Sequence, residues 1–236
     1  MDFSTLSPEL LTLLQEVDTP TVCNAIEVAQ KKRGFANFTR KTMFISDSKA
    51  KAVVGFARTA KIAAVHPPTE PPEEIRARRM AYFRAMAEGP RPSIAVVEDV
   101  DYPDCIGAWW GGVHTAVHNG LGLSGAVTNG VMRDLDDMQP GFTVIARSIG
   151  PSHGFVHVKE LGTTVNVLGM QVNQGDLIHA DRHGALAVPS DVIPKLFDAI
   201  NTLISTESII LEPARQPDFD IDKLEAAWAL FEQSRT

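Results

Sequence analysis

Arg133 and Asp134 follow one another in the chain and are the residues whose types could do chemistry together. The planar guanidinium of an arginine pairs with a carboxylate, and each such charged hydrogen bond contributes about 1.5–3 kcal/mol. The aspartate supplies the hard oxygen that Mg²⁺ or Mn²⁺ prefers, with water in the remaining positions. Together they could hold a small 2-oxo acid, with the arginine on its carboxylate and a metal on its keto oxygen. The alternative is structural: an aspartate that caps a helix, beside a surface arginine.

Two consecutive glycines, Gly111 and Gly112, are the second feature. They follow a predicted strand and loop, and they precede Val113, Ala116 and Val117, which have helical spacing. A helix that begins at two glycines leaves its first backbone N–H groups bare, and such an end attracts a carboxylate or phosphate by about 0.3–2 kcal/mol. A tight turn without a ligand is the other interpretation, and the glycines alone do not decide between the two.

Both features lie in or beside a stretch without charge. From Cys105 to Met132 there are 28 residues without Asp, Glu, Lys or Arg, and seven of the 17 glycines lie there. The stretch is long enough to span a bilayer, but its histidines, asparagines and glycines are not a lipid-facing composition. Residues 120–125 match G-x-G-x-x-G, yet they follow a helical segment and open a strand, which is the reverse of a dinucleotide-binding fingerprint. Gly120 and Gly122 are therefore predicted to stop the helix and form a turn.

The elements that must position these residues follow from hydrophobic periodicity and from turn residues. The order of helices, a strand-helix-strand core, short strands and final helices predicts one mixed α/β domain over residues 1–236. The helix with four arginines could form a patch for an anion or RNA, but a solvated face is predicted instead, with Glu74 and Arg78 forming an ion pair one turn apart. Predicted helices cover 8–17 (with Ser7 as N-cap), 18–30, 73–88, 112–121 and the C-terminal 190–211 and 220–234; predicted strands cover 50–65, 93–100, 125–129, 142–147, 156–161, 164–168, 175–181 and 185–189.

Composition excludes several classes of protein. Hydrophobic residues make up 44% and charged residues 22% of 236, which is typical of a globular chain rather than a disordered one. The net charge of −7 argues against nucleic-acid binding, because that affinity depends on neutralising phosphates. The first residues lack the pattern of a signal peptide, and Cys23 and Cys105 have no CxxC spacing. We therefore expect two reduced thiols, a cytoplasmic location, and neither a nucleic-acid nor a membrane partner.

A long segment that contains both features resembles the signature of the RraA-like family. This segment is AWWGGVHTAVHNGLGLSGAVTNGVMRDLDD, and the likeness extends to DTPTVCNAIE, GFARTA and GDLIHADRHGALAVP, so that it covers most of residues 18–211. The family includes metal-dependent, class II 4-hydroxy-4-methyl-2-oxoglutarate aldolases, which also decarboxylate oxaloacetate, and regulators of ribonuclease E activity. The resemblance implies a three-layer α/β/β sandwich like the swivelling phosphohistidine domain. It also implies homotrimers or dimers of trimers, with active sites at subunit interfaces.

The resemblance also implies roles for individual residues. Arg133 matches the arginine that contacts the substrate, and Asp134 matches the aspartate that ligates the metal, Mg²⁺ or alternatively Mn²⁺. The chain departs from the family at Gly112, where members have an aspartate that supports the metal through water, and at Asn24, where many have Asp. His114 or Asp137 could compensate, Asp137 as an outer support of the metal. In the family the backbone amides of a Gly-Asp-x-x helix start hold the substrate carboxylate, and these positions fall on Gly111, Gly112, Val113 and His114.

We therefore expect a metal-dependent lyase that cleaves or decarboxylates a small 2-oxo acid through a pyruvate enolate, with Arg133 and Asp134 as catalytic residues. One site can serve both reactions because both develop the same negative charge. The other hypothesis is a non-catalytic regulator that binds a ribonuclease or helicase partner, which the missing aspartate and the acidic net charge favour. His153 and His157 are expected to have core or surface roles.

Overall fold

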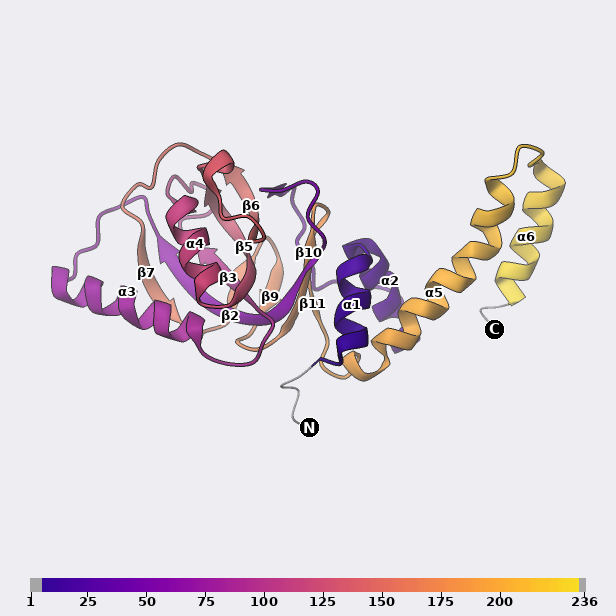
Figure 1. Ribbon diagram of the computed structural model, residues 1–236, viewed down its shortest axis with the longest axis horizontal. Coiled ribbons are helices and arrows are strands. Elements are labelled where there is room, and N and C mark those ends of the chain that lie inside the picture. Colours follow the sequence, from indigo (N-terminus) through magenta and orange to yellow (C-terminus); the bar gives the residue numbers. More distant parts are fainter. Residues whose placement is uncertain (1–5, 234–236) are drawn as a thin grey trace. The chain divides into compact units, whose positions relative to one another are not determined.

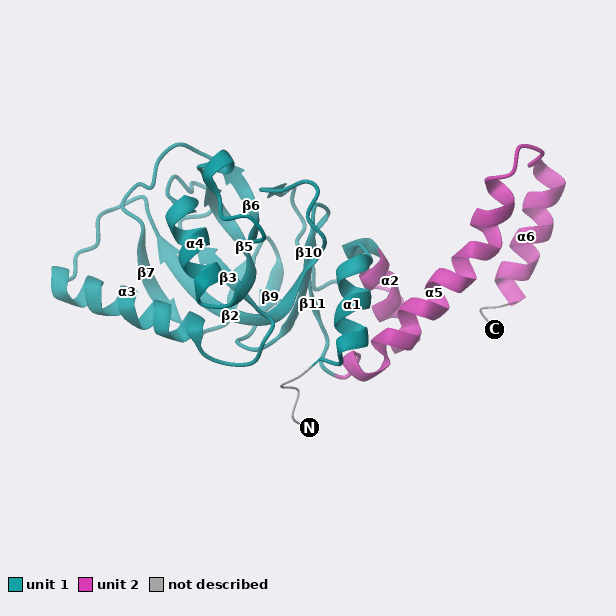
Figure 2. Ribbon diagram, in the orientation of Figure 1, with its two compact units in different colours: residues 1–20, 36–190 teal, residues 21–35, 191–236 magenta. Residues whose placement is uncertain are grey.

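The computed structural model describes residues 6–233. The chain divides into two compact units, which are described separately (Figure 2). The first, here the sheet unit, comprises residues 1–20 and 36–190. The second, here the helical unit, comprises residues 21–35 and 191–236.

A nine-stranded mixed sheet forms the sheet unit. Its strands lie in the order β1-β6-β5-β3-β2-β10-β11, with β4 beside β5 and β7 beside β2. The pairs β2–β3, β3–β5, β5–β6 and β4–β5 are parallel, and the other pairs are antiparallel. The strands are β1 (Phe44–Ile45), β2 (Val53–Ala63), β3 (Ser93–Asp99), β4 (Ala108–Trp110), β5 (Leu123–Met132), β6 (Thr143–Ile149), β7 (His157–Leu161), β10 (Leu177–Asp181) and β11 (Gly184–Val188).

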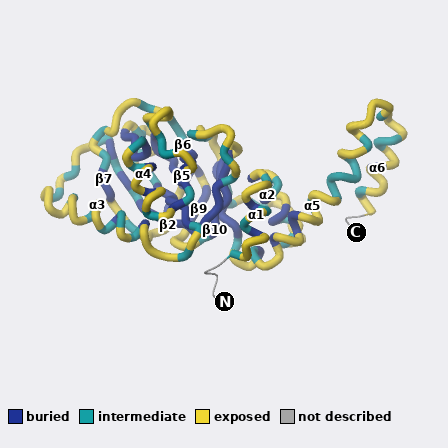
Figure 3. The backbone as a smooth tube through the Cα atoms, viewed as in Figure 1, coloured by how far each residue is buried: buried dark blue, intermediate teal, exposed yellow. Residues whose placement is uncertain are grey.

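Elements cover both faces of this sheet, so that the central strands are buried on both sides (Figures 1 and 3). On one face, Tyr82 and Met86 of α3 (Pro72–Ala87) belong to a buried cluster with residues of β3, β4, β5 and β6. The same side carries α4 (Gly112–Gly120), which packs on β4 and β5. On the other face, the hairpin of β8 (Val165–Val167) and β9 (Met170–Val172) packs on β2, β3 and β5. The predicted three-layer α/β/β arrangement is therefore confirmed.

The first helices of the chain are tied to strand β10. Helix α1 (Pro8–Glu16) begins at its predicted cap, where the Ser7 hydroxyl accepts the Leu10 N–H at 3.2 Å. The ring of His179 in β10 lies between α1 and the start of α2 (Thr19–Gln30). Its Nε2 donates to the Leu14 carbonyl at 2.8 Å, and its Nδ1 accepts the Thr19 hydroxyl at 3.0 Å. Both ring nitrogens are satisfied, so this histidine is a structural residue of the core.

The helical unit contains the rest of α2, together with α5 (Ile193–Ala214) and α6 (Ile221–Gln233). Helices α5 and α6 pack against one another as a hairpin. Within α6 the Trp228 ring N–H donates to the Glu232 carboxylate at 3.2 Å. Among residues 6–233, no helix combines the length and the apolar character that a membrane crossing requires.

Most predicted elements are confirmed, but one predicted ion pair is wrong. Arg78 on α3 does not pair with Glu74; its guanidinium donates to Glu70 at 2.8 Å and to the Val158 carbonyl of β7 at 3.2 Å. Glu70 precedes the helix, and Arg78 lies on the side of α3 that packs against β7. The Arg78 side of the helix is therefore used for packing, whereas Arg76, Arg79 and Arg84 are exposed, as predicted.

Candidate functional site

The start of α4 is a bare helix end beside the Arg133–Asp134 pair. Gly111 is the N-cap, and because it has no side chain it makes no capping hydrogen bond of its own. The Trp110 carbonyl accepts the Arg133 N–H at 2.9 Å, which holds the end of β4 against the end of β5. The Gly112 N–H donates to Oδ2 of Asp134 at 3.3 Å, and the next amides in the first turn have no acceptor within the helix. An anion in this position would therefore meet unsatisfied donors and the positive end of the helix dipole.

Asp134 has the left-handed backbone conformation, with φ 55° and ψ 45°. Residues other than glycine rarely adopt this region, and such positions cluster at functional sites. The conformation turns the chain from β5 into the 3₁₀ turn Leu135–Asp137 and leaves the carboxylate facing the start of α4. The Arg133 Nε lies 3.6 Å from Asp134 Oδ2, and both side chains are about one-third exposed. The pair is thus open to a ligand.

A pocket of about 200 Å³ brings most of the predicted site together. Its lining includes five of the seven residues that the sequence singled out, whereas Gly112 and Asp137 do not line it. The complete lining consists of Arg79, Ala108, Trp109, Gly111, Val113, His114, Arg133, Asp134, His153 and Val156. Residues of β4, α4 and the end of β5 therefore converge, as predicted, on one hollow of the sheet unit.

The two glycines are required by close approach of the chain. A Cβ atom on Gly112 would lie 2.9 Å from the Asp137 carbonyl oxygen, a distance that real Cβ atoms essentially never show. A Cβ on Gly111 would lie 2.5 Å from Oδ2 of Asp134. The 3₁₀ turn occupies the space that a side chain at position 112 would need, so this backbone arrangement excludes the aspartate that the family carries there.

His114 is a neutral imidazole in the wall of the pocket. Its ring centroid lies 4.2 Å from that of Trp109, edge to face. Burial, with the nearby His118, Arg79 and Arg133, lowers the pKa of His114 to about 4. Its Nδ1 is buried and has no hydrogen-bond partner in the described chain. Because an unpaired buried N–H is costly, the favoured tautomer carries its proton on Nε2, which makes that atom a hydrogen-bond donor.

A buried chain of hydrogen bonds holds His114 and Trp109 in place. The His118 Nδ1 donates to the His114 carbonyl at 2.6 Å, and its Nε2 accepts the Tyr82 hydroxyl at 2.7 Å. The same hydroxyl accepts the Trp109 indole N–H at 3.2 Å. Burial lowers the pKa of His118 to about 4, so this ring is also neutral at neutral pH. Each of these groups is satisfied, so the network holds the pocket wall rigid.

The donor set of the pocket fits a divalent cation that is held by one carboxylate. Asp134 is the single carboxylate in the lining, and no group of three or more His, Cys, Asp or Glu in residues 6–233 could hold a metal by itself. Oδ2 of Asp134 already meets the Gly112 amide and the Arg133 guanidinium, which leaves Oδ1 for a ligand. Mg²⁺ is commonly bound by one or two carboxylates, with water and substrate oxygens completing the shell. Asp134 with a bound acid and water fits that pattern.

Five residues of the lining were not among the predicted site residues: Arg79, Ala108, Trp109, His153 and Val156. Arg79 is one of the arginines predicted to be solvated, and His153 was expected to have a core or surface role. His153 donates from Nδ1 to the Gly154 carbonyl at 2.7 Å and is one of the residues that line the pocket. The run of arginines on this helix allowed an anion or RNA patch as the alternative to a solvated face, but nothing in the sequence indicates which arginine lines the pocket.

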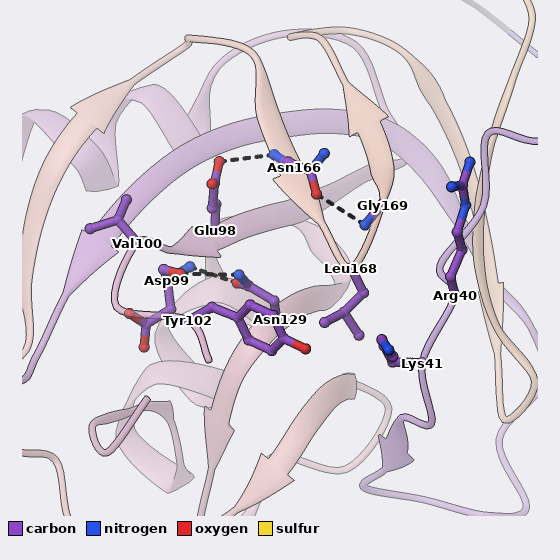
Figure 4. Close-up of a pocket in the computed structure, with 10 residues that line it drawn as sticks. All are labelled: Arg40, Lys41, Glu98, Asp99, Val100, Tyr102, Asn129, Asn166, Leu168 and Gly169. Atoms are coloured by element: carbon purple, nitrogen blue, oxygen red, sulfur yellow. Dashed lines mark hydrogen bonds between the residues drawn. The ribbon is translucent and has the colours of Figure 1, made fainter. Parts of the chain in front are cut away.

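A larger hollow of about 420 Å³ lies elsewhere in the sheet unit (Figure 4). Its central polar contact is structural: the Asn129 side chain accepts the Asp99 N–H at 2.7 Å and donates to the Asp99 carbonyl at 3.0 Å. Glu98 accepts the Asn166 N–H at 2.8 Å, as drawn in the same view. Burial raises the pKa of Asp99, which favours its neutral form. The polar groups there hold β3, β5 and the β8–β9 hairpin together, whereas those around Arg133 line the smaller pocket.

Comparison with known proteins identifies the family to which most of the chain belongs. The model of the RraA-like family, described as Aldolase/RraA, matches residues 19–187. An uncharacterized protein of Methanocaldococcus jannaschii, MJ0644, is 28% identical over 107 residues, which is 44% of this chain. The matched segment spans about half, 51%, of that relative's length.

Solved structures share the fold. An uncharacterized protein from Pseudomonas syringae has a TM-score of 0.70 at 19% identity, and the match covers 98% of this chain and 97% of that one. RraAS2 of Streptomyces coelicolor, described as an unusual member of the RNase ES inhibitor RraA protein family, has a TM-score of 0.66 at 21% identity. That match covers 86% of this chain and 95% of RraAS2. The family match includes the helix start, the Arg133–Asp134 pair and the late strands, and this chain belongs to the RraA-like family.

Proposed function

We propose that this protein is a metal-dependent lyase that cleaves or decarboxylates a small 2-oxo acid, with Mg²⁺ as the preferred cation and Mn²⁺ as the alternative. The RraA-like family includes both aldolase or decarboxylase enzymes and RraA regulators. One observation carries the enzymatic assignment: a bare helix start, a guanidinium, a carboxylate and a neutral imidazole face the same small pocket. A regulator that acts only through its surface would need none of these groups to converge.

The helix start and Arg133 would bind the carboxylate of the acid. The Val113 and His114 amides are the first free donors of α4, and the Arg133 side chain lies beside them in the pocket lining. A carboxylate held by two backbone amides and a planar guanidinium is fixed in orientation as well as position. This orientation would direct the 2-oxo group toward Asp134. Holding the reacting groups in place in this way would lower the entropic part of the activation barrier.

Charge stabilisation in the pocket would then favour breaking the bond between C3 and C4. The electron pair of that bond moves into the 2-oxo group and leaves the enolate of pyruvate, with CO₂ or an oxo acid as the other product. In the aldol cleavage the 4-hydroxyl group gives up its proton to water, and in both reactions the enolate takes a proton from water at C3 to become pyruvate. Asp134 would hold the divalent cation, which would supply polarisation of the 2-oxo oxygen and stabilise its developing negative charge. The Arg133 guanidinium and the Nε2–H of His114 supply preorganised donors for the same charge.

The test is magnesium-dependent release of pyruvate from oxaloacetate and from 4-hydroxy-2-oxo acids. Metal-stripped wild-type protein should be inactive, and adding Mg²⁺ should restore turnover. Asp134→Asn keeps the size of the side chain but removes its charge, and we expect a loss of at least about 100-fold in kcat/KM. Asp136→Asn is the matched control, because Asp136 is an exposed residue of the same turn that does not line the pocket. Equal turnover of Asp134→Asn and Asp136→Asn would refute the assignment.

The alternative function is regulation of a ribonuclease or helicase. The net charge of −7 would suit a basic segment of a partner, and RraAS2 is described as belonging to an inhibitor family. A regulator should inhibit ribonuclease activity equally well as wild type and as Asp134→Asn, and it should release no pyruvate. Turnover that depends on Asp134 would favour the enzyme instead.

A further inference from the structure

His153 is a residue of the pocket that has no role in the chemistry proposed above. It lies in the loop between β6 and β7, and it lines the pocket together with Arg133 and Asp134. Its Nδ1 lies 2.7 Å from the Gly154 carbonyl oxygen. A carbonyl oxygen can only accept, so Nδ1 carries the proton of the neutral ring and Nε2 carries a lone pair. No described residue bonds to that lone pair, which is therefore free to take a proton.

The backbone of this loop is held firmly beside the pocket. The Ala108 N–H of β4 donates to the Ser152 carbonyl at 2.8 Å, and the Val156 N–H donates to the His153 carbonyl at 3.2 Å. Gly107 approaches so closely that a Cβ atom there would lie 2.7 Å from the His153 carbonyl oxygen. The side chain of His153 is exposed, but its backbone is fixed from both directions along the chain. Such a residue is positioned to meet a ligand in the pocket without a large loss of entropy.

The other polar side chains of the lining are poorly suited to accept a proton from a ligand. The two guanidiniums have no basic lone pair, and the Trp109 indole N–H is a donor that already bonds to a tyrosine hydroxyl. His114 has a pKa of about 4, and its favoured tautomer carries the proton on Nε2. Asp134 is assigned to the cation. Among the described residues that line the pocket, His153 is therefore the one with a free basic atom.

We propose that Nε2 of His153 is the general base that takes the proton of the 4-hydroxyl group when a 4-hydroxy-2-oxo acid is cleaved. This inference rests on the proposed function, in which that proton ends in water. The pair of the O–H bond forms the C=O bond of the released oxo acid, the pair of the C3–C4 bond forms the enolate, and the proton moves to Nε2. The Gly154 carbonyl, which accepts from Nδ1, stabilises the imidazolium until it gives its proton to water.

Decarboxylation gives this base nothing to do. The carboxylate that leaves as CO₂ carries no proton, so the C3–C4 bond can break without a general base. The role of His153 is therefore specific to one of the two reactions, although both use the same pocket and both release pyruvate. A general base of this kind contributes about 10²- to 10⁴-fold to the rate.

One assay of pyruvate release compares the two reactions in the Mg²⁺-loaded full chain. His153→Gln removes the basic nitrogen and keeps a polar side chain of similar length. Its kcat for 4-hydroxy-2-oxoglutarate should fall about 10²- to 10⁴-fold, and its kcat for oxaloacetate should stay within about threefold of the wild type. His66→Gln is the matched control, because His66 is an exposed histidine of the sheet unit that lies outside the lining. It should leave both reactions unchanged.

The tautomer of His153 can be measured without metal or substrate. In proton–nitrogen correlation spectra of the metal-free full chain, the imidazole signals that disappear in His153→Gln should show the proton on Nδ1, and a proton on Nε2 would overturn the inference. Equal loss of both reactions in His153→Gln would also overturn it. If the wild type releases pyruvate from both acids and His153→Gln does so equally well, the lyase stands and only the base falls. If the wild type releases pyruvate from neither acid, the lyase assignment itself falls, and the base falls with it.

Discussion

Substitution of Gly112 by alanine tests the closest backbone approach in the site. An added Cβ would lie 2.9 Å from the Asp137 carbonyl oxygen and 3.7 Å from the Asp137 Cβ. The first contact is with backbone, so no side chain can rotate away, and either the start of α4 or the 3₁₀ turn must shift. Overpacking of this kind costs about 1–3 kcal/mol, against a gain of at most about 1 kcal/mol from replacing glycine in a helix. We therefore expect a net loss of about 1–2 kcal/mol.

Gly120→Ala is the matched control for this change. Gly120 ends the same helix, and nothing lies within 4 Å of an added Cβ there. Its stability should stay the same or rise by up to about 1 kcal/mol, because alanine loses less backbone entropy than glycine on folding. Thermal unfolding by circular dichroism should show Gly112→Ala about 2–8 °C below the wild type, since 1 kcal/mol corresponds to about 2–4 °C in a chain of this size. Gly120→Ala should match or exceed the wild type.

Gly112→Asp extends the test to the position where the family carries a carboxylate. The same Cβ contact predicts that this variant is less stable than the wild type, and that its carboxylate does not simply complete a metal site. If Gly112→Ala proves as stable as Gly120→Ala, the steric reasoning is refuted. A Gly112→Asp variant that keeps its stability and binds Mg²⁺ more tightly would refute it as well, because the turn at Asp137 would then accommodate a side chain at position 112.

Two further predictions concern the buried network behind the pocket. Unfolded histidines titrate near pH 6.5, whereas the pKa values of His114 and His118 are about 4, so the unfolded chain binds protons that the folded chain refuses. Stability should therefore be complete above pH 6.5 and fall as the pH drops toward 4, and urea unfolding at several pH values should show a smaller fall for His114→Gln. Tyr82→Phe removes the donor to His118 and the acceptor for Trp109, which leaves two buried groups unpaired. We expect a loss of about 1–3 kcal/mol in urea unfolding, and an unchanged midpoint would contradict the network.

The long elements could be predicted because their residues carry the signal locally. The apolar runs of β3 and β5 belong to strands that are buried on both faces, and α1 has both its cap and its leucine spacing in sequence. The short strands β1, β4 and β9 could not be predicted in the same way. Two or three residues contain no period, and β4 exists because Ala108 and Trp110 pair with the end of β5.

The residues of the site also fall into those that could be predicted from the sequence and those that could not. Arg133, Asp134 and the glycines could be identified because their order in the chain carries the information. Arg79 could not, because its place depends on how α3 lies over the sheet, and neither its type nor its spacing distinguishes it from Arg76. The left-handed conformation of Asp134 could not be predicted either, because aspartate does not indicate a positive φ as strongly as glycine does.

The glycine at position 112 alters the charge balance of the pocket as well as its sterics. Without an aspartate there, Asp134 is the single carboxylate beside two guanidiniums and a neutral imidazole in the lining. The pocket by itself should therefore bind a cation weakly and an anion well. A 2-oxo acid whose carboxylate is bound at Arg133 would offset this positive charge and add its own oxygens to the carboxylate of Asp134. Acid and Mg²⁺ should then strengthen one another's binding by the same factor, as linkage requires. In the Mg²⁺ reloading experiment, the Mg²⁺ concentration for half-maximal turnover should therefore fall as oxaloacetate increases, and a constant value would mean that Asp134 holds the cation without help from the acid.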